Sequence, residues 1–316
     1  MQLVRYLLIV ISASLLILAS ATWLINRGLI RSGADFYGKI NAAGDTANKT
    51  NLLLVGSSRM LVHLDPAILD SATKLNSYNY GLNAGTIKTC FNVISYALHF
   101  QKKVKAVVLN IDYNMFDIDQ DPYKDAYYYP YEHNGIDFKL NNSGNVHLVH
   151  AVHFMDMSLY DDFVKFASVD GMIRPGRTVQ GLFKGYYPHR TLNDFADIKS
   201  APVEKVKIPF PETGLKLLEN CISLCKQQKV NLVLVLAPYY KKRAPEYFYS
   251  NYFDIIEAVL KLSKQQNIPF FDFRSLFLKG DSGYFYNTNH LNIKGASVYS
   301  AAVGDSLRNY LGANTK

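Results

Sequence analysis

Short apolar runs alternate with helical patterns along most of this chain, and this alternation constrains its fold more than any other feature. The runs are short, and they occupy residues 51–55, 75–80, 104–111, 231–236 and 268–273. The third, 104–111, is rich in β-branched residues, as buried parallel strands are. The helical patterns that follow the runs occupy residues 86–100, 212–228, 252–265 and 293–311. Alternation of this kind predicts an α/β fold, a doubly wound parallel sheet between two layers of helices. Ligands of such sheets bind beyond the carboxyl ends of the strands, so functional residues are expected there.

The alternation stops after the third strand and resumes only near residue 212. Residues 112–210 contain a Tyr-rich stretch, a helical pattern near 146–167 and many Gly and Pro residues. We interpret 112–210 as an insertion after the third strand, within one α/β domain that spans residues 49–313.

Two sets of side chains in this insertion have more than one interpretation. Five tyrosines at its start could offer aromatic faces to a sugar or pack onto their own domain; they are Tyr123, Tyr127, Tyr128, Tyr129 and Tyr131. Three histidines lie three residues apart in the expected helix; they are His147, His150 and His153. Steps of ~300° spread these three over about a third of the helix circumference, so a half-exposed helix face is expected there and not a metal site.

The N-terminal segment has the length and composition of a membrane-spanning helix. Residues 6–25 carry no charged side chain, and a helix of ~20 apolar residues crosses a bilayer. Residues 19–21, Ala-Ser-Ala, also resemble a signal-peptide cleavage site. We therefore expect residues 1–26 to be a transmembrane signal anchor or a signal peptide, and residues 27–48 to be a polar tether.

The charges that flank this segment leave its orientation open. Arg5 precedes it, and Arg27, Arg31 and Lys39 follow it, so the positive-inside rule does not decide. If the N-terminus stays inside, the folded domain is extracytoplasmic, on the periplasmic or cell-surface side of a bacterial membrane.

The net charge and the cysteine count limit the classes of partner. A formal net charge of +8 favours an acidic polymer, a lipid headgroup surface or nucleic acid. Nucleic acid is not expected, because the densest basic run is only Lys241-Lys242-Arg243. There are three cysteines, and Cys221 and Cys225 are interpreted as core thiols, since no metal set or disulfide framework accompanies them. No cofactor is expected.

A candidate nucleophile and a candidate base follow the first and last strands. Gly56-Ser57-Ser58-Arg59 comes directly after the first strand, where a small turn can project a hydroxyl into a cleft. His290 lies between the last strand and the last helix, at the same edge of the sheet, and a neutral imidazole there can accept the Ser58 proton. His63, five residues after Ser58, is a fallback base.

Two further strand ends carry candidate donors for an oxyanion. Gly81 follows the second strand, and its backbone N–H could face the developing charge of an acyl-transfer transition state. Asn114 follows the third strand and could donate from its side chain, as could the backbone N–H of Ser58. Each signal is common by itself. Four candidates on four strand ends of one sheet edge, in this order, predict serine-dependent acyl chemistry together.

The order and spacing of these residues resemble the SGNH, or GDSL-type, hydrolase superfamily. In particular they resemble its extracytoplasmic branch concerned with polysaccharide O-acetylation and teichoic-acid D-alanylation. Residues 56–58 fall on the Gly-Asp-Ser block, which implies that Ser58 is the nucleophile and not Ser57. Gly81 falls on the glycine of the second block. The similarity covers residues 50–111 and 212–312.

The third and last blocks match with departures. Asn114 falls on the third-block asparagine, although Asp112 stands where the family usually has Gly. His290 falls on the histidine of the Asp-x-x-His block, but Asn287 stands in place of the triad Asp. Three alternatives stay open: a dyad oriented by Asn287 or a carbonyl, a triad completed by Asp272 or Asp281, or a degenerate site that only binds.

The resemblance implies transfer of an O-acyl group, with acetyl expected, on a cell-surface or exported polysaccharide. Alternatives are a carbohydrate esterase or deacetylase, and a glycan-binding scaffold with a decayed site. The resemblance also implies a membrane-embedded partner that supplies acyl groups. Arg59, Lys241, Lys242 and Arg243 are expected at the substrate rim, where they would attract an anionic substrate.

Overall fold

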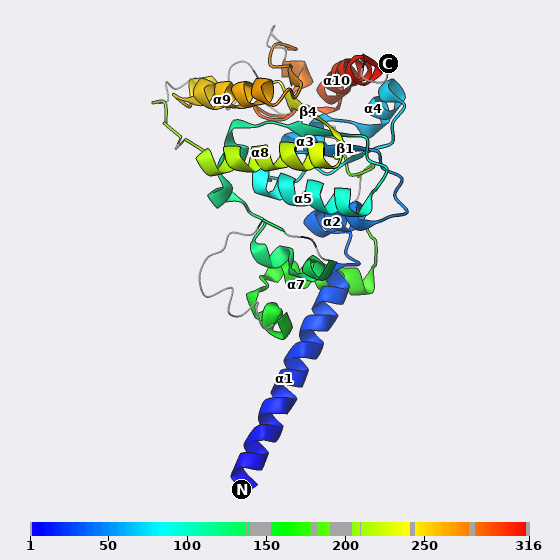
Figure 1. The fold of residues 1–316 in the computed structure, drawn as a ribbon, viewed down its shortest axis with the longest axis vertical. Helices are drawn as coiled ribbons and strands as arrows, with labels where there is room; N and C mark the ends of the chain where they lie inside the picture. Colours follow the sequence, from blue (N-terminus) through cyan, green and yellow to red (C-terminus); the bar gives the residue numbers. More distant parts are fainter. Residues whose placement is uncertain are drawn as a thin grey trace. The chain divides into compact units, whose positions relative to one another are not determined.

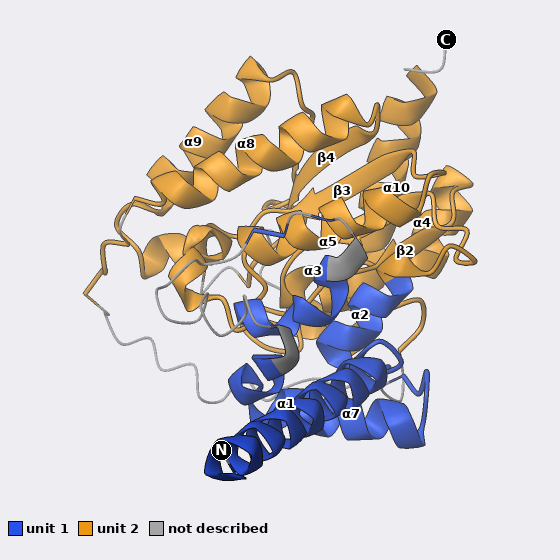
Figure 2. Cartoon of the chain, turned by 60° about the horizontal axis from the view of Figure 1, so that its bottom comes forward, with its two compact units in different colours: residues 1–42, 123–180 blue, residues 43–122, 181–316 orange. Residues whose placement is uncertain are grey.

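The chain divides into two compact units. The computed structural model describes residues 2–134, 136, 138–139, 153–178, 182–189, 204–208, 210–240, 244–277 and 282–313. Unit 1 comprises residues 1–42 and 123–180, and unit 2 comprises residues 43–122 and 181–316 (Figure 2). Residues 123–180 of the expected insertion therefore group with the N-terminal helix.

Unit 2 is built on five parallel strands in the order β2-β1-β3-β4-β5. The strands are β1 (Leu52–Val55), β2 (Ser77–Asn79), β3 (Ala106–Asn110), β4 (Asn231–Leu236) and β5 (Phe270–Asp272). Leu52 pairs with Ser77 on one side and with Ala106 on the other, so the strands run in register toward one carboxyl edge. The predicted doubly wound parallel sheet is confirmed.

Helices cover both faces of this sheet (Figure 1). They are α3 (Ser58–His63), α4 (Pro66–Thr73), α5 (Ile87–Phe100), α8 (Glu212–Gln227), α9 (Tyr252–Gln265) and α10 (Ile293–Ala313). α10 packs against α3 and α4 over one face, whereas α5 and α8 pack together, against β1 and β4 respectively. Successive strand residues point to opposite faces, so Leu52 and Leu54 join the α10 layer while the buried Leu53 points to the other layer. Cys221 and Cys225 on α8 are buried free thiols, as predicted, and so is Cys90 on α5, for which no prediction was made.

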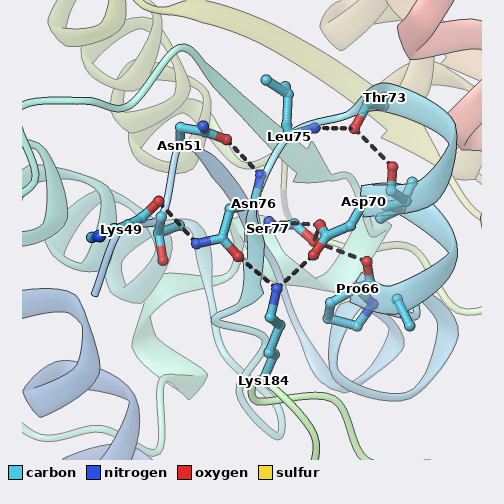
Figure 3. Close-up of polar contacts among 12 residues, drawn as sticks. Lys49, Asn51, Pro66, Asp70, Thr73, Leu75, Asn76, Ser77 and Lys184 are labelled. Atoms are coloured by element: carbon cyan, nitrogen blue, oxygen red, sulfur yellow. Dashed lines mark hydrogen bonds and ion pairs between the residues drawn. The ribbon is translucent and has the colours of Figure 1, made fainter. Parts of the chain in front are cut away.

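The outer edge of β2 is covered by residues 182–189. Lys184 and Gly185 both have positive φ, +45° and +78°, in a two-residue turn bridged by Phe183 and Tyr186. The Lys184 carbonyl accepts the Asn79 N–H at 2.8 Å, and the Lys184 ammonium lies 2.5 Å from an Asp70 carboxylate oxygen (Figure 3). Pairing an exposed edge strand in this way blocks association with another chain.

Asp70 and Asn76 tie that turn to the sheet (Figure 3). The Lys184 ammonium also donates to the Asn76 side-chain oxygen at 2.6 Å. The second Asp70 oxygen accepts the Ser77 N–H at 2.7 Å, and Asn76 donates to the Lys49 carbonyl at 2.9 Å. The segment is thereby fixed at its start, and further along it His189 lies beside the carboxyl edge, with its ring 5.9 Å from that of His290.

Unit 1 contains α1 (Gln2–Leu29), most of α2 (Asp35–Gly44), and α7 (Asp162–Ile173). The described residues of the two units also form short 3-10 helices: η1 (Tyr113–Phe116), η2 (Ile118–Gln120), η3 (Asp125–Tyr127), η4 (Tyr129–Asn134), η5 (His153–Leu159), η7 (Pro245–Tyr247) and η8 (Ser282–Tyr284). Within the described ranges, α1 is the one helix long and apolar enough to cross a membrane, and a signal sequence would pass the same test.

Residues 27–48 are not the polar tether that we expected. α1 continues to Leu29, and α2 occupies most of the remainder. The reason is an apolar face on α2, where Phe36, Tyr37 and Ile40 are fully buried and favour a packed helix over an extended linker.

The tyrosines at the start of the insertion form the aromatic core of unit 1. All five are buried; Phe36 stacks on Tyr123 with ring centroids 5.0 Å apart, and Tyr37 stacks on Tyr127 at 6.0 Å. The packing interpretation is therefore confirmed over the sugar-binding one. Of the histidines considered for metal, His147 and His150 lie outside the described residues, and for His153 only the backbone, at the start of η5, is described.

Candidate active site

The nucleophile candidate is placed by the turn between β1 and α3. Ser57 is the N-cap of α3, in an extended conformation, and its Oγ accepts the Arg59 N–H at 3.2 Å. Ser is a preferred N-cap because its hydroxyl satisfies a free N–H of the first turn. Ser58 is therefore the first residue of a helix that begins immediately after a buried strand, at the carboxyl edge of the sheet.

Ser58 and His290 are brought together, as their positions in the sequence predict. Ser58 Oγ lies 2.8 Å from His290 Nε2, within hydrogen-bond reach for a general base. His290 Nδ1 lies 3.1 Å from Asn287 Oδ1. The same amide oxygen accepts the backbone N–H groups of Asn289 at 2.9 Å and of His290 at 2.8 Å, which identifies it as oxygen.

This arrangement determines which ring nitrogen of His290 carries the proton. An amide oxygen can only accept, so Nδ1 donates to Asn287 and Nε2 is left with a lone pair toward the Ser58 hydroxyl. The neutral imidazole is thus in the tautomer that a base requires. Asn287 supplies orientation but no charge.

No described carboxylate takes the place of the missing triad Asp beside His290. Asp272 instead pairs with Arg274, with one carboxylate oxygen 2.6 Å from the guanidinium. Asp281 lies outside the described residues. Among the described residues, Asn287 is the orienting group, which is the dyad alternative.

The surroundings of His290 make it a weak base. Burial lowers the pKa of its imidazole to about 4, and the positive charges of Arg59 and His189 act in the same direction, against a smaller opposing effect of Asp112. At neutral pH the ring is therefore neutral and able to accept a proton, but the imidazolium that forms during catalysis gains little stabilisation.

His63 does not serve as the fallback base. Its ring is fully buried, and its Nε2 accepts the Leu291 N–H at 3.0 Å, so that lone pair is occupied. Burial and the Arg59 charge also hold its pKa well below the ordinary value. The His63 ring lies 6.0 Å from that of His290, and it supports the backbone directly after His290.

A buried ionic cluster lies beneath the nucleophile turn. Asp112, at the end of β3, is 1% exposed and accepts a short hydrogen bond from Ser57 Oγ. It also accepts from the Asn110 amide at 3.0 Å, from the Arg59 guanidinium at 2.5 Å and from the Tyr239 hydroxyl at 3.3 Å. Sequence reasoning noticed Asp112 only as a departure at the end of the third strand; its partners could not be identified from the sequence.

Arg59 is part of this cluster, and its predicted position at the substrate rim is wrong. The side chain is 4% exposed, donates to the Ala237 and Pro238 carbonyls at 2.7 Å each, and lies 3.5 Å over the Tyr239 ring. The Asp112 carboxylate and these carbonyls satisfy the charge in the interior, where a buried guanidinium needs such partners. The other predicted rim residues, Lys241, Lys242 and Arg243, lie outside the described residues.

The three candidate oxyanion donors differ in whether they already donate a hydrogen bond within the protein. The Gly81 N–H donates to Asn79 Oδ1 at 2.9 Å, and a Cβ on Gly81 would lie 2.3 Å from the Leu61 nitrogen. Asn114 is exposed on η1 and makes no hydrogen bond to Ser58 or His290. The Ser58 N–H, at the start of α3, has no acceptor among the described residues. The roles of Gly81 and Asn114 stay predictions, and Gly81 would have to exchange its acceptor.

Two rings that the sequence did not single out lie beside His290. His189 stacks on Tyr286, with centroids 4.0 Å apart and planes 6° apart, and its ring lies 5.9 Å from that of His290. The His189 carbonyl accepts the Ile293 N–H at 2.8 Å, which joins the 182–189 segment to α10. His189 is half-buried, and burial lowers its pKa. No sequence signal marks this pair.

A cavity of about 460 Å³ lies at the ends of β4 and β5. Tyr239, Glu246, Phe253 and Arg274 contribute to its lining. It shares Tyr239 with the buried cluster, but neither Ser58 nor His290 lines it. The cavity is therefore separate from the reacting pair.

Comparison with known proteins adds structural similarity only. No protein-family model matches the sequence, and neither does any curated protein. Among solved structures, a protein of the G-D-S-L family described as lipolytic, from Desulfitobacterium hafniense, is 10% identical at a TM-score of 0.43, covering 81% of this chain and 98% of its own. The lipase/acylhydrolase from Enterococcus faecalis is 12% identical at a TM-score of 0.42, over 83% of this chain and 96% of its own. These similarities are distant, so the site assignment rests on the geometry of this chain.

Proposed function

We propose that this chain is a serine-dependent acyl-ester enzyme of the SGNH type, with Ser58 as nucleophile and His290 as its base. The observation that carries the proposal is the 2.8 Å contact between Ser58 Oγ and His290 Nε2, with Nδ1 held by Asn287. The sequence resemblance, drawn from the order of the motifs, supports the same assignment.

The first half of the reaction forms an acyl-enzyme. Ser58 Oγ attacks the ester carbonyl carbon as His290 Nε2 takes the hydroxyl proton. The Ser58 N–H stabilises the oxyanion of the tetrahedral intermediate. The intermediate then expels the alcohol, which receives the proton from His290, and the acyl group stays on Ser58.

The second half transfers the acyl group onward. A sugar hydroxyl, or water in the hydrolytic case, gives its proton to His290 Nε2 and attacks the acyl carbonyl carbon; the Ser58 oxygen then leaves and takes that proton back. Replacing the triad Asp by Asn costs ~10⁴ in kcat in a serine protease. We therefore expect a slow enzyme, because Asn287 cannot stabilise the imidazolium by charge.

We propose O-acetyl transfer to a cell-surface or exported polysaccharide as the reaction, with hydrolysis of such esters as the alternative. The stacked His189 and Tyr286 rings beside His290 favour a sugar substrate, since aromatic faces suit sugar rings. The apolar α1 favours a place at the membrane. The proposal puts the folded domain on the extracytoplasmic side, next to a membrane-embedded acyl donor.

A second candidate is a glycan-binding scaffold without turnover. Two observations favour it: Asn287 replaces the triad carboxylate, and the Gly81 N–H is already bonded to Asn79. Both would follow if selection for catalysis had been lost.

The test is turnover of p-nitrophenyl acetate by the purified full chain in detergent. Ser58→Ala should reduce the rate to the uncatalysed level, and His290→Ala should lower it by ~10²–10⁴, the usual contribution of a general base. Ser250→Ala, at an exposed serine, is the matched control and should leave the rate unchanged. Turnover that survives Ser58→Ala would overturn the assignment, and no turnover by the native chain would favour the scaffold.

Adding a neutral oligosaccharide to the same assay separates transferase from esterase. A transferase should release less free acetate and yield an acetylated sugar. An esterase should release acetate in full, with no modified sugar by mass spectrometry.

A further inference from the structure

In unit 1, α7 packs on the C-terminal end of α1 through small residues. The side that α7 buries consists of Val164, Ala167, Ser168 and Gly171. A Cβ built on Gly171 would lie 2.1 Å from the Gly28 carbonyl oxygen, and Ser168 Oγ donates to the Ile25 carbonyl at 2.8 Å. Figure 2 shows the two helices side by side. Backbones in such close contact hold α7 firmly against α1.

The opposite side of α7 exposes large apolar side chains. Phe166 is 66% exposed, Val169 47% and Ile173 72%. At 100° per residue these three lie within a sector of about 60°, opposite the side that packs on α1. Asp162 lies in the same sector and pairs with Lys165 at 3.7 Å, and Asp170 pairs with Arg174 beside it. An exposed apolar surface of this kind marks a binding face.

This face is continuous with the apolar surface of α1, and that continuity identifies what covers it. α1 exposes apolar side chains along most of its length, down to Trp23 and Leu24. The Arg27 guanidinium lies 5.7 Å over the Trp23 ring, a pairing typical of the membrane–water boundary. α7 contacts α1 at Ile25 and Gly28, both of which follow Trp23.

The charges around the junction fit a lipid headgroup layer. Four arginines lie at this end of unit 1: Arg27, Arg31, Arg177, and Arg174, which pairs with Asp170. The Gly176 N–H donates to the Arg31 carbonyl at 2.8 Å, so the segment after α7 stays beside the end of α1. Basic residues at this level attract anionic headgroups.

We propose that α7 is an interfacial helix that lies in the same bilayer surface that α1 reaches, with Phe166, Val169 and Ile173 buried among the acyl chains. Unit 1 then contacts the membrane through two elements instead of one. This inference does not depend on the proposed chemistry of Ser58 and His290.

Tryptophan quenching by lipids with brominated acyl chains tests the proposal. The chain has one tryptophan, Trp23, which serves as the membrane-embedded reference in proteoliposomes of phosphatidylcholine and phosphatidylglycerol. The test variant is Trp23→Phe/Phe166→Trp. The water-side control is Trp23→Phe/Tyr247→Trp, which replaces an exposed tyrosine of unit 2.

We expect the new tryptophan at 166 to be quenched to within about two-fold of Trp23, as an interfacial helix buried at the acyl boundary would be. The tryptophan at 247 should not be quenched. Quenching at 166 no greater than at 247 would overturn the proposal, and so would an unquenched Trp23. Protection of the residue at 166 from iodide without quenching by brominated lipid would show that a second copy covers the face, which also overturns it.

Discussion

The nucleophile turn and the histidine loop meet at one edge of the sheet, but they are held in place by different kinds of interaction. Residues 57–59 are fixed by a buried ion pair between Arg59 and Asp112. The loop that carries His290 is fixed by the neutral amide of Asn287. The carboxylate of this site therefore lies beneath the nucleophile and not behind the base.

The position of the nucleophile and the reactivity of the base therefore depend on different interactions. Removing one partner of a buried ion pair costs about 3–5 kcal/mol, because the other charge is left uncompensated. A neutral hydrogen bond contributes only about 0.5–1.5 kcal/mol. The nucleophile should thus be rigidly placed, while the base receives orientation without electrostatic help.

The largest expected effect comes from breaking the buried pair. Asp112→Asn leaves the Arg59 guanidinium in the interior without its counter-charge, so we expect a loss of about 3–5 kcal/mol in the free energy of unfolding. Urea denaturation of the full chain measures it. Asp272→Asn is the matched control, since its partly exposed pair with Arg274 should cost about 0–1 kcal/mol. Equal losses in the two variants would contradict the comparison.

A carboxylate beside Nδ1 of His290 should give the histidine loop a buried negative charge, as the nucleophile turn already has in Asp112. Asn287→Asp places a negative charge beside Nδ1 of His290 and should raise kcat at least about 10-fold. The reverse change, Asp to Asn in the triad of a serine protease, lowers kcat by ~10⁴. Asn289→Asp adds the same charge at an exposed neighbour and should change kcat little. An unchanged kcat in Asn287→Asp would show that the base already has another source of charge.

The dependence of kcat/KM on pH tests whether His290 lacks electrostatic support. With a pKa of about 4, the His290 imidazole stays in its basic form as the pH falls to about 4, so kcat/KM of the native chain should be lost only near that pH. The added charge in Asn287→Asp raises this pKa, so the acidic limb should move to higher pH. A native limb near the ordinary histidine value would contradict the account of the histidine loop.

The smallest expected effect concerns the rings beside the histidine loop. His189→Ala removes one of the two rings proposed to contact the sugar and should raise KM about 2–10-fold for a sugar ester with kcat nearly unchanged, as the loss of one aromatic contact of about 0.5–1.5 kcal/mol implies. Steady-state kinetics on an acetylated sugar measures the two constants separately. A fall in kcat comparable to that of His290→Ala would mean that His189 takes part in proton transfer.

Local patterns in the sequence predicted the sheet and the reacting pair well. Parallel strands end at one edge, so the strand pattern alone placed Ser58 and His290 together, although 232 residues separate them. The position of Asn287 three residues before His290 also allowed its contact with Nδ1 to be anticipated. These are short-range features combined with one topological rule.

The remaining features depend on tertiary packing that no local pattern encodes. Arg59 looked like a surface residue because its partner Asp112 lies 53 residues away. His189 stacks on Tyr286 in a segment that is bonded to β2 at Lys184 and to α10 at His189 itself, and both bonds join parts of the chain far apart in sequence. Residues 27–48 looked polar because the aromatic partners of Phe36 lie beyond residue 120.

Labelling with a fluorophosphonate probe tests the Ser58–His290 pair most directly. The probe forms a covalent bond only with an activated serine hydroxyl, and peptide mass spectrometry of the full chain identifies the serine. We predict labelling at Ser58, its loss in His290→Ala and its persistence in Ser57→Ala, whose hydroxyl bonds to Asp112 instead. No labelling of the native chain, or labelling of Ser58 that persists in His290→Ala, would contradict the central claim that the imidazole activates this hydroxyl.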